Sequence, residues 1–345
     1  MEKKEYYYWF DWIRFIAALI CVECHVRYAL LDPICWDDDE WYVSILYYIT
    51  HVNTQVFSFF ILSGFLVGGK SIEKILNGTF KLKNYLIDRG VRIYLPFLPA
   101  LLFASVVKSL VLDTPLTLRE FTGNLLPLQN IFSPPLIVTF WTLSYEIWFY
   151  IFMGSFAGFW CIKNKRMIFF ICILVSFFAL SRLTFSTFSY WLLGALAYFV
   201  PVKKNRVVLI SMILIILSLE IVRLFPDFLG RSVPYVAILY IFTIAFSLLL
   251  KQVMQFKPSS SFVKGIENIG HQLGSFTYTL YLMHIPFISI LEKIGFIQRM
   301  TYISWKFLFY WIICTLICLI CCYLTYLLFE KHTNKVKRFV QQIWS

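Results

Sequence analysis

The sequence predicts an all-α, polytopic membrane protein, a single domain over residues 1–345 that crosses a lipid bilayer about ten times with both termini in the cytoplasm. Of its residues, 60% are hydrophobic and only 14% are charged, whereas soluble domains average about 45–50% apolar and about 25% charged residues. Ten apolar stretches are long enough, or nearly so, to cross a hydrocarbon core of about 30 Å. Lys and Arg residues also gather in alternate loops, as is typical of cytoplasmic loops.

The ten stretches follow one another along the whole chain. They are residues 9–31, 43–68, 91–112, 140–162, 167–185, 188–202, 207–225, 233–250, 272–296 and 305–329. The sixth is short, and the second contains the polar segment His51 to Gln55, which predicts a loop or a broken helix. The loops between them leave no room for a soluble catalytic domain, so any chemistry is expected in or against the membrane.

The distribution of charge in the loops predicts the orientation. With the N-terminus inside, the expected cytoplasmic segments hold 21 of the 31 Lys and Arg residues. These segments are residues 1–8, 69–92, 163–166, 201–206, 251–265 and 330–345. The first loop on the opposite side, Asp37 to Glu40, is acidic. This is the positive-inside pattern, so the net charge of +12 indicates cytoplasmic loops rather than a nucleic-acid partner.

The nine cysteines predict no metal site. Most of them lie within apolar runs, where thiols usually behave as small hydrophobic groups. The pairs Cys21/Cys24 and Cys318/Cys321 have the spacing of zinc ligands, but both lie inside predicted helices without a matching pair of histidines.

Ionisable side chains inside a membrane span are costly, so they are candidates for function. In the first stretch, Arg14 and His25 are eleven residues apart, which places them on one helix face about 16 Å apart along the axis. Asp11 lies near the same face and can pair with Arg14 at a spacing of three residues. Two alternatives stay open: Arg14 as an anchor that reaches the membrane surface, and His25 as a partner in an interhelical hydrogen bond.

The second stretch contains two small residues, Ser63 and Gly64, within the segment Phe59 to Phe65. Small residues let membrane helices approach closely. Helix packing is therefore the default interpretation of this segment.

Arg89 and Arg92 lie one turn apart just before the third stretch. Two guanidinium groups at this spacing suit the binding of phosphate groups. The alternative is that they only determine topology.

The fourth stretch begins with Trp141 to Glu146, which places a carboxylate inside the outer half of a predicted span. Glu146 and His25 are expected at similar depth. A carboxylate beside a histidine in an apolar cavity supports general-base catalysis. The alternative role of Glu146 is a structural salt bridge.

Tyr278, Tyr281 and His284 recur at helical spacing in the ninth stretch, ahead of Pro286, which predicts a kink and a cavity. On spacing alone, the favoured interpretation of His284 is a structural histidine whose ring nitrogens are satisfied.

Together these residues resemble the acyltransferase-3 family, integral-membrane enzymes that O-acylate bacterial surface polysaccharides. The matching elements occur in the family's order: Asp11 to Arg14 with His25; Phe59 to Phe65; Arg89 to Ile93 with Pro96; Trp141 to Glu146 with Tyr150; Leu273 to Tyr278; Tyr281 to Pro286; and Glu330. The sequence departs from the family pattern at three positions, where Thr142 and Thr277 replace serine and His332 replaces the proline after Glu330.

The resemblance implies a protein of the bacterial plasma (inner) membrane with no tightly bound cofactor. It implies an acyl-CoA donor, acetyl-CoA above all, and a hydroxyl of a cell-surface or exported glycan as acceptor. Besides the lipid bilayer, glycan-assembly proteins are possible partners.

The resemblance also implies roles for individual residues. His25 acts as general base with Glu146, and a covalent acyl-histidine stays open as an alternative. The resemblance implies that the phosphates of CoA are bound by Arg14, Arg89 and Arg92. Supporting roles fall to Asp11, Ser63, Trp141, Tyr150, Tyr281 and His284.

Two other functional classes compete with this interpretation. A transporter or flippase of a lipid-linked glycan also uses intramembrane His, Arg and Glu residues, but the chain has no evident inverted repeat. A receptor or structural protein leaves the alignment of Arg14 with His25 unexplained.

Overall fold

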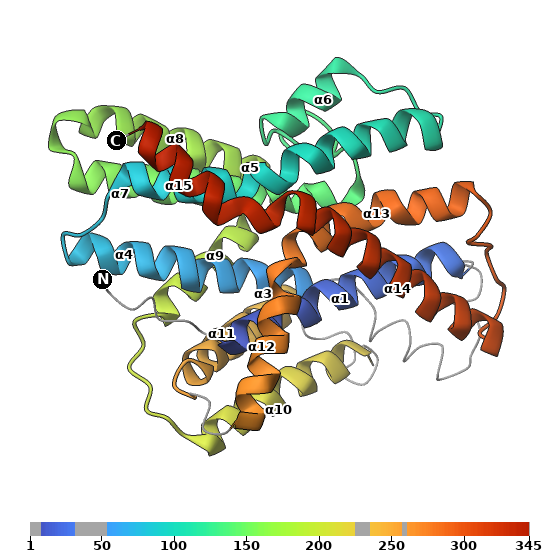
Figure 1. Ribbon diagram of the computed structural model, residues 1–345. Coiled ribbons are helices and arrows are strands. Elements are labelled where there is room, and N and C mark those ends of the chain that lie inside the picture. The colour runs from blue at the N-terminus through green and yellow to red at the C-terminus, as the bar shows by residue number, and fades with distance from the viewer. Residues whose placement is uncertain (1–7, 32–53, 225–234, 257–260, 345) are drawn as a thin grey trace. The chain divides into compact units, whose positions relative to one another are not determined.

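The computed structural model describes residues 8–31, 54–224, 235–256 and 261–344, and in these residues the chain is helical without strands. The α-helices are α1 (Tyr8–Leu30), α3 (Thr54–Ser63), α4 (Lys70–Leu76), α5 (Leu82–Val106), α6 (Leu118–Leu125), α7 (Trp141–Cys161), α8 (Arg166–Arg182), α9 (Phe185–Ala197), α10 (Arg206–Leu224), α11 (Tyr235–Val253), α12 (Ser261–Ser275), α13 (Thr277–Lys293), α14 (Trp305–Leu328) and α15 (Thr333–Ile343) (Figure 1). Short π-helical and 3₁₀ segments join some of them: η2 (Gly64–Gly69), η3 (Val107–Val111), η4 (Val138–Phe140), η5 (Lys163–Lys165) and η7 (Glu330–His332).

Each of the ten predicted stretches overlaps at least one of these helices. The helix of the third stretch, α5, begins at Leu82 rather than at residue 91, because the polar segment before residue 91 is also helical and continues into the apolar part without a break. Helix α13 continues through Pro286. Of the polar segment at the start of the second stretch, residues 51–53 lie outside the described residues, and α3 begins at Thr54.

Within the part of the chain that the structure describes, five helical segments are long and apolar enough to cross a membrane: Thr54–Leu76, Leu82–Val111, Lys163–Arg182, Tyr235–Val253 and Trp305–Ile343. Helices α12 and α13 make a sixth if this bent pair counts as one span. The described residues therefore confirm five or six of the predicted spans by length and composition. The total of ten and the cytoplasmic location of both termini stay predictions.

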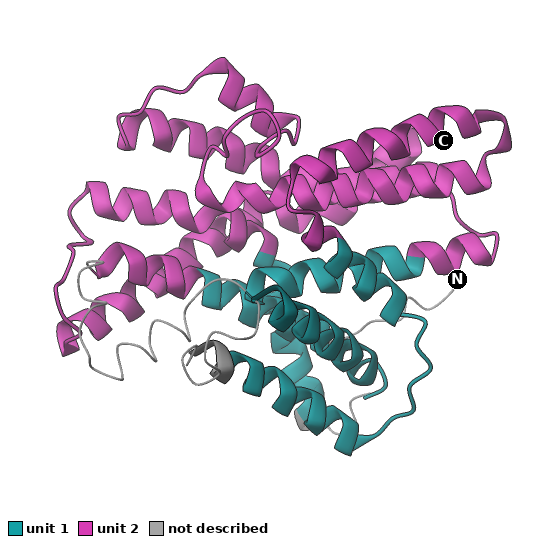
Figure 2. Cartoon of the chain, turned by 180° about the vertical axis from the view of Figure 1, so that it is seen from behind, with its two compact units in different colours: residues 1–21, 38–70, 189–277 teal, residues 22–37, 71–188, 278–345 magenta. Residues whose placement is uncertain are grey.

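The chain divides into two compact units (Figure 2). Unit 1 comprises residues 1–21, 38–70 and 189–277, and unit 2 comprises residues 22–37, 71–188 and 278–345. Boundaries fall inside α1 and α9 and at the starts of α4 and α13, so these four helices contribute residues to both units.

Unit 1 contains a close crossing of α3 and η2 with α9. A Cβ atom added to Gly64 would lie 1.9 Å from the carbonyl oxygen of Trp191, and one added to Gly194 would lie 2.3 Å from that of Ile61. The indole nitrogen of Trp191 donates a hydrogen bond to Ser63 Oγ (3.3 Å). The predicted packing role of the segment around Ser63 and Gly64 is thus confirmed, since only glycine allows the two backbones to touch.

In unit 2, the segment between η3 and α7 is fixed by buried polar side chains. Ser144 of α7 donates to the carbonyl oxygen of Gln129 (2.7 Å), and the Gln129 amide donates to that of Phe140 (3.1 Å). Asn124 of α6 accepts from the backbone nitrogen of Leu136 (3.0 Å). These contacts satisfy backbone groups of the loop and of its junction with α7. They hold the start of α7 in one place, with Thr142 on its first turn and Glu146 on the next.

Candidate active site

The central feature of unit 2 is a contact between two histidines from helices far apart in the sequence. His284 Nε2 of α13 lies 3.1 Å from His25 Nδ1 of α1, and the ring centroids are 5.1 Å apart. His284 is fully buried, whereas His25 is partly exposed. One imidazole therefore belongs to the protein interior, and the other remains accessible to a ligand.

The hydrogen-bond network assigns the tautomers of this pair. His284 Nδ1 lies 2.8 Å from the carbonyl oxygen of Leu280, which can only accept. In the neutral pair, Nδ1 of His284 therefore carries the proton, and its Nε2 accepts a hydrogen bond from Nδ1 of His25. This leaves His25 Nε2 with its lone pair, which is the form that a general base requires.

Tyr281 connects this pair to α7. Its ring centroid lies 6.2 Å from that of His284, and a hydrogen bond of 3.1 Å joins its hydroxyl to Thr142 Oγ1. Thr142 also donates to the carbonyl oxygen of Thr139 (3.2 Å). Threonine at position 142, where serine was expected, therefore keeps the hydroxyl that the contact needs. In the same turn, the ring of Trp141 packs edge-on against Tyr145 at 5.5 Å.

Glu146 is half-buried on the next turn of α7, and its oxygen Oε1 accepts a hydrogen bond from Tyr150 (2.5 Å). The sequence-based hypothesis gave Glu146 the role of supporting His25. In the structure, the imidazole beside His25 Nδ1 is that of His284, and Glu146 interacts instead with Tyr150 and, electrostatically, with Tyr278. His284 is thus better placed than Glu146 to orient the base.

The turn of α5 that carries Arg89 and Arg92, called the arginine turn below, also belongs to unit 2. Arg89 pairs with Asp88, and its guanidinium carbon lies 5.6 Å from the ring centroid of Tyr150. Asp88 also pairs with Lys337 of α15, which packs along α5 (Figure 1). Arg92 is exposed and available to a ligand.

Glu330 of η7 lies beside the first turn of α13. Its oxygen Oε2 accepts hydrogen bonds from the backbone nitrogen (3.0 Å) and the hydroxyl (2.6 Å) of Thr279. The carboxylate therefore satisfies one of the amide groups that the start of a helix leaves without an intrahelical acceptor. It also interacts electrostatically with Arg92, so Glu330 connects the arginine turn with the helix that carries His284.

Unit 1 contains the predicted ion pair of the first stretch. Arg14 Nη1 lies 2.8 Å from Asp11 Oδ1, as the spacing of three residues predicts. The other oxygen of Asp11 lies 3.1 Å from Nδ1 of His271 on α12. A Cβ atom added to Gly274 would lie 2.5 Å from that of Asp11, so glycine there allows α12 to approach this carboxylate.

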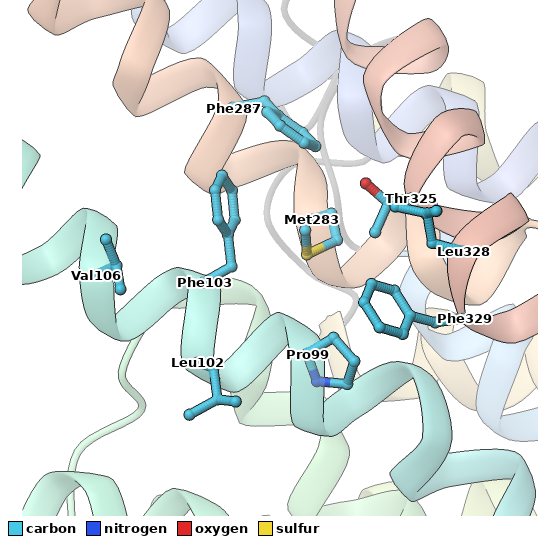
Figure 3. Close-up of a pocket in the computed structure, with 9 residues that line it drawn as sticks. All are labelled: Pro99, Leu102, Phe103, Val106, Met283, Phe287, Thr325, Leu328 and Phe329. Carbon is cyan, nitrogen blue, oxygen red and sulfur yellow. The ribbon is translucent and has the colours of Figure 1, made fainter.

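An apolar cavity of about 490 Å³ lies among α5, α13 and α14 (Figure 3). It is lined by Pro99, Leu102, Phe103, Val106, Met283, Phe287, Thr325, Leu328 and Phe329. Met283 precedes His284 on α13, and its side chain lies among the rings of Phe103, Phe287 and Phe329. A lining of this kind suits hydrocarbon rather than a charged ligand.

A comparison with known protein families identifies the family to which the chain belongs. A family model described as an acyltransferase domain matches residues 7–327, nearly the whole chain. The chain belongs to the acyltransferase-3 family. It is therefore a multi-pass membrane O-acyltransferase. No curated protein and no solved structure matches it.

In this acyltransferase, most of the residues proposed from the sequence belong to unit 2, namely His25, Arg89, Arg92, Trp141, Glu146, Tyr150, Tyr281 and His284, while Asp11, Arg14 and Ser63 belong to unit 1. Sequence reasoning missed His271 and Thr279. A histidine in a polar helix and a threonine at a helix start give no signal of a tertiary contact. The sequence marks Glu330 only through the family resemblance, and no pattern in the sequence predicts its contact with Thr279.

Proposed function

We propose that this acyltransferase moves an acyl group, most simply acetyl, from cytoplasmic acyl-CoA to a hydroxyl of a cell-surface or exported glycan in the bacterial plasma membrane. The observation that carries the proposal is the hydrogen bond between His25 and His284. This bond gives His25, which is partly exposed, the tautomer in which Nδ1 carries the proton and Nε2 is the basic nitrogen.

In the proposed reaction, Nε2 of His25 takes the proton of the acceptor hydroxyl as its oxygen attacks the thioester carbonyl. The carbon–sulfur bond then breaks, and the proton passes from His25 to the departing sulfur, which leaves as the thiol of CoA. His284 supports the imidazolium through its Nε2, which accepts from the protonated Nδ1 throughout. A covalent acyl-histidine followed by transfer to the glycan uses the same residues in two steps.

Arg89 and Arg92 are proposed to bind the phosphates of CoA. Both lie on one turn of α5, and the exposure of Arg92 supports a direct, charge-assisted contact. Arg89 is already aligned by Asp88 and by the ring of Tyr150. Arg14 is a further candidate, and the structure gives it the carboxylate of Asp11 as partner.

The test is acyl transfer in membrane vesicles. Labelled acetyl-CoA and the native glycan are supplied to vesicles that contain wild-type protein, His25→Ala, or His332→Ala as a control at an exposed histidine. We expect labelled glycan with the wild type and the control, and none with His25→Ala at equal expression. Label that persists in His25→Ala contradicts the role of His25. No label with wild type, tried with several acyl-CoA donors, contradicts the proposed function.

A further inference from the structure

Tyr278 on the first turn of α13 has a hydroxyl that its surroundings do not satisfy. The oxygen is buried, and among the residues that the structure describes no group is within hydrogen-bonding distance of it. Leaving a buried hydroxyl without a partner is unfavourable, and each such group in a native protein calls for an explanation. A bound substrate that completes the hydrogen bond provides one.

The groups around Tyr278 define what that substrate must offer. Tyr278 interacts electrostatically with Glu146, Tyr150, Glu330 and Arg92. Both carboxylates already have donors, because Glu146 accepts from Tyr150 and Glu330 accepts from Thr279. The phenol of Tyr278, which interacts electrostatically with Arg92, therefore lacks an acceptor oxygen among the described residues, and a carbonyl group is a suitable one.

The position of Tyr278 suggests which part of the substrate supplies this oxygen. It interacts with Arg92, the proposed phosphate ligand, and it lies six residues before His284 on the same helix. Six residues correspond to about 9 Å of helix rise. A donor that extends from the arginine turn to His25 thus passes Tyr278 with its middle part. In acyl-CoA, the part between the phosphates and the thioester is the pantetheine arm, which contains two amide groups.

We infer that the Tyr278 hydroxyl donates a hydrogen bond to an amide carbonyl of the pantetheine arm of the donor. The inference rests on the proposed function, because it takes acyl-CoA as the donor. It adds a binding residue between the arginine turn and the histidine pair. It also predicts that the enzyme recognises the amide of the donor separately from the phosphates.

The experiment compares three acetyl thioesters that differ in these groups. Acetyl-CoA has the phosphates and the amides, S-acetylpantetheine has only the amides, and S-acetylmercaptoethanol has neither. Each is tested at high concentration with wild type, Tyr278→Phe and Arg92→Ala, and the values of kcat/KM for the donor are compared. Tyr94→Phe is the matched control, since Tyr94 is a half-buried tyrosine of α5 whose hydroxyl bonds weakly to the carbonyl oxygen of Leu125 (3.4 Å).

Loss of one buried hydrogen bond should lower kcat/KM of Tyr278→Phe about tenfold. The loss should be similar with acetyl-CoA and S-acetylpantetheine and absent with S-acetylmercaptoethanol. Arg92→Ala should differ, with a loss only for acetyl-CoA. Removal of an unsatisfied hydroxyl should leave the Tm of the free protein unchanged or raise it.

The inference is overturned if Tyr278→Phe equals wild type with the two amide-containing donors, or if it loses the same factor with all three. A lowered Tm together with a uniform loss identifies a structural role. If wild type itself fails to use acetyl-CoA, the proposed function falls, and this outcome is distinct from a defect confined to Tyr278→Phe.

Discussion

His284 is placed between two hydrogen-bonding partners: its Nδ1 lies 2.8 Å from the carbonyl oxygen of Leu280, and its Nε2 lies 3.1 Å from His25 Nδ1. The carbonyl fixes the tautomer of His284, and His284 in turn fixes that of His25. The proton-accepting nitrogen of the proposed base is thus determined by a backbone group one helical turn before His284. No carboxylate is needed for this orientation.

The first prediction concerns Thr142, which connects α7 to the histidine helix through Tyr281. Thr142→Ser keeps the hydroxyl and should retain near wild-type transfer. Thr142→Val keeps the shape but leaves the Tyr281 hydroxyl without this partner, and should lower kcat about tenfold through misplacement of α13. Steady-state transfer rates at saturating donor distinguish the two variants. Equal rates for valine and serine would show that the bond does not matter.

The second prediction concerns the close crossing of α3 and α9 in unit 1. A Cβ atom at position 194 would lie 2.3 Å from the carbonyl oxygen of Ile61, so Gly194→Ala must push the helices apart. We expect a loss of about 1–3 kcal/mol in the free energy of unfolding, read as a lower thermal midpoint in detergent. The control is Gly265→Ala at an exposed position of α12, where nothing lies within 4 Å of the added Cβ atom. It should be neutral or stabilising by up to about 1 kcal/mol. A Gly194→Ala variant as stable as this control contradicts the crossing.

The third prediction concerns pH and the short helix α6. Glu120 Oε1 lies 2.6 Å from Lys108 Nζ, and Oε2 accepts from Thr117 in a capping box. The hydrogen bond from Lys108, followed by those from Thr117, holds the pKa of Glu120 below its usual range. A lowered pKa in the folded state means that the carboxylate stabilises the fold above its ordinary pKa of about 4.3 and loses this effect as the pH falls through the folded value.

Glu120→Gln should therefore cost about 1 kcal/mol of stability at neutral pH. The difference from wild type should shrink as the pH drops below about 4, because wild type then loses the same charge. Thermal midpoints measured from pH 7 downward test this. A deficit that stays constant with pH would show that the carboxylate charge has no part in it.

The sequence predicted the helical architecture well because hydropathy reports directly on burial in lipid. The start of α5 was misplaced because Leu82 to Asp88 is too polar to count as membrane-spanning, although it is helical. Helix α6 was missed even though Thr117 and Glu120 have the spacing of a capping box. This spacing predicts a helix start only weakly, and the proline-rich composition of the segment favours a loop instead.

For the site, contacts within one helix were predictable and contacts between helices were not. The pair of Asp11 with Arg14 follows from helical spacing and is present. His25 and His284 are 259 positions apart, and no single-sequence pattern specifies that they meet. The predicted depths of His25 and Glu146 in the membrane are similar, which favours Glu146 as the partner of His25. Similar depth, however, does not predict which of several helices is the neighbour of α1.

The most direct test of the central claim is a double-mutant comparison of His25→Ala, His284→Ala and the double variant in the vesicle transfer assay. If His284 acts only by orienting His25, His284→Ala should lower kcat about 10²-fold, a part of the 10²–10⁴-fold effect of a general base. The double variant should then be no slower than His25→Ala alone. Losses that multiply in the double variant, or a His284→Ala variant with wild-type kcat, would contradict the account.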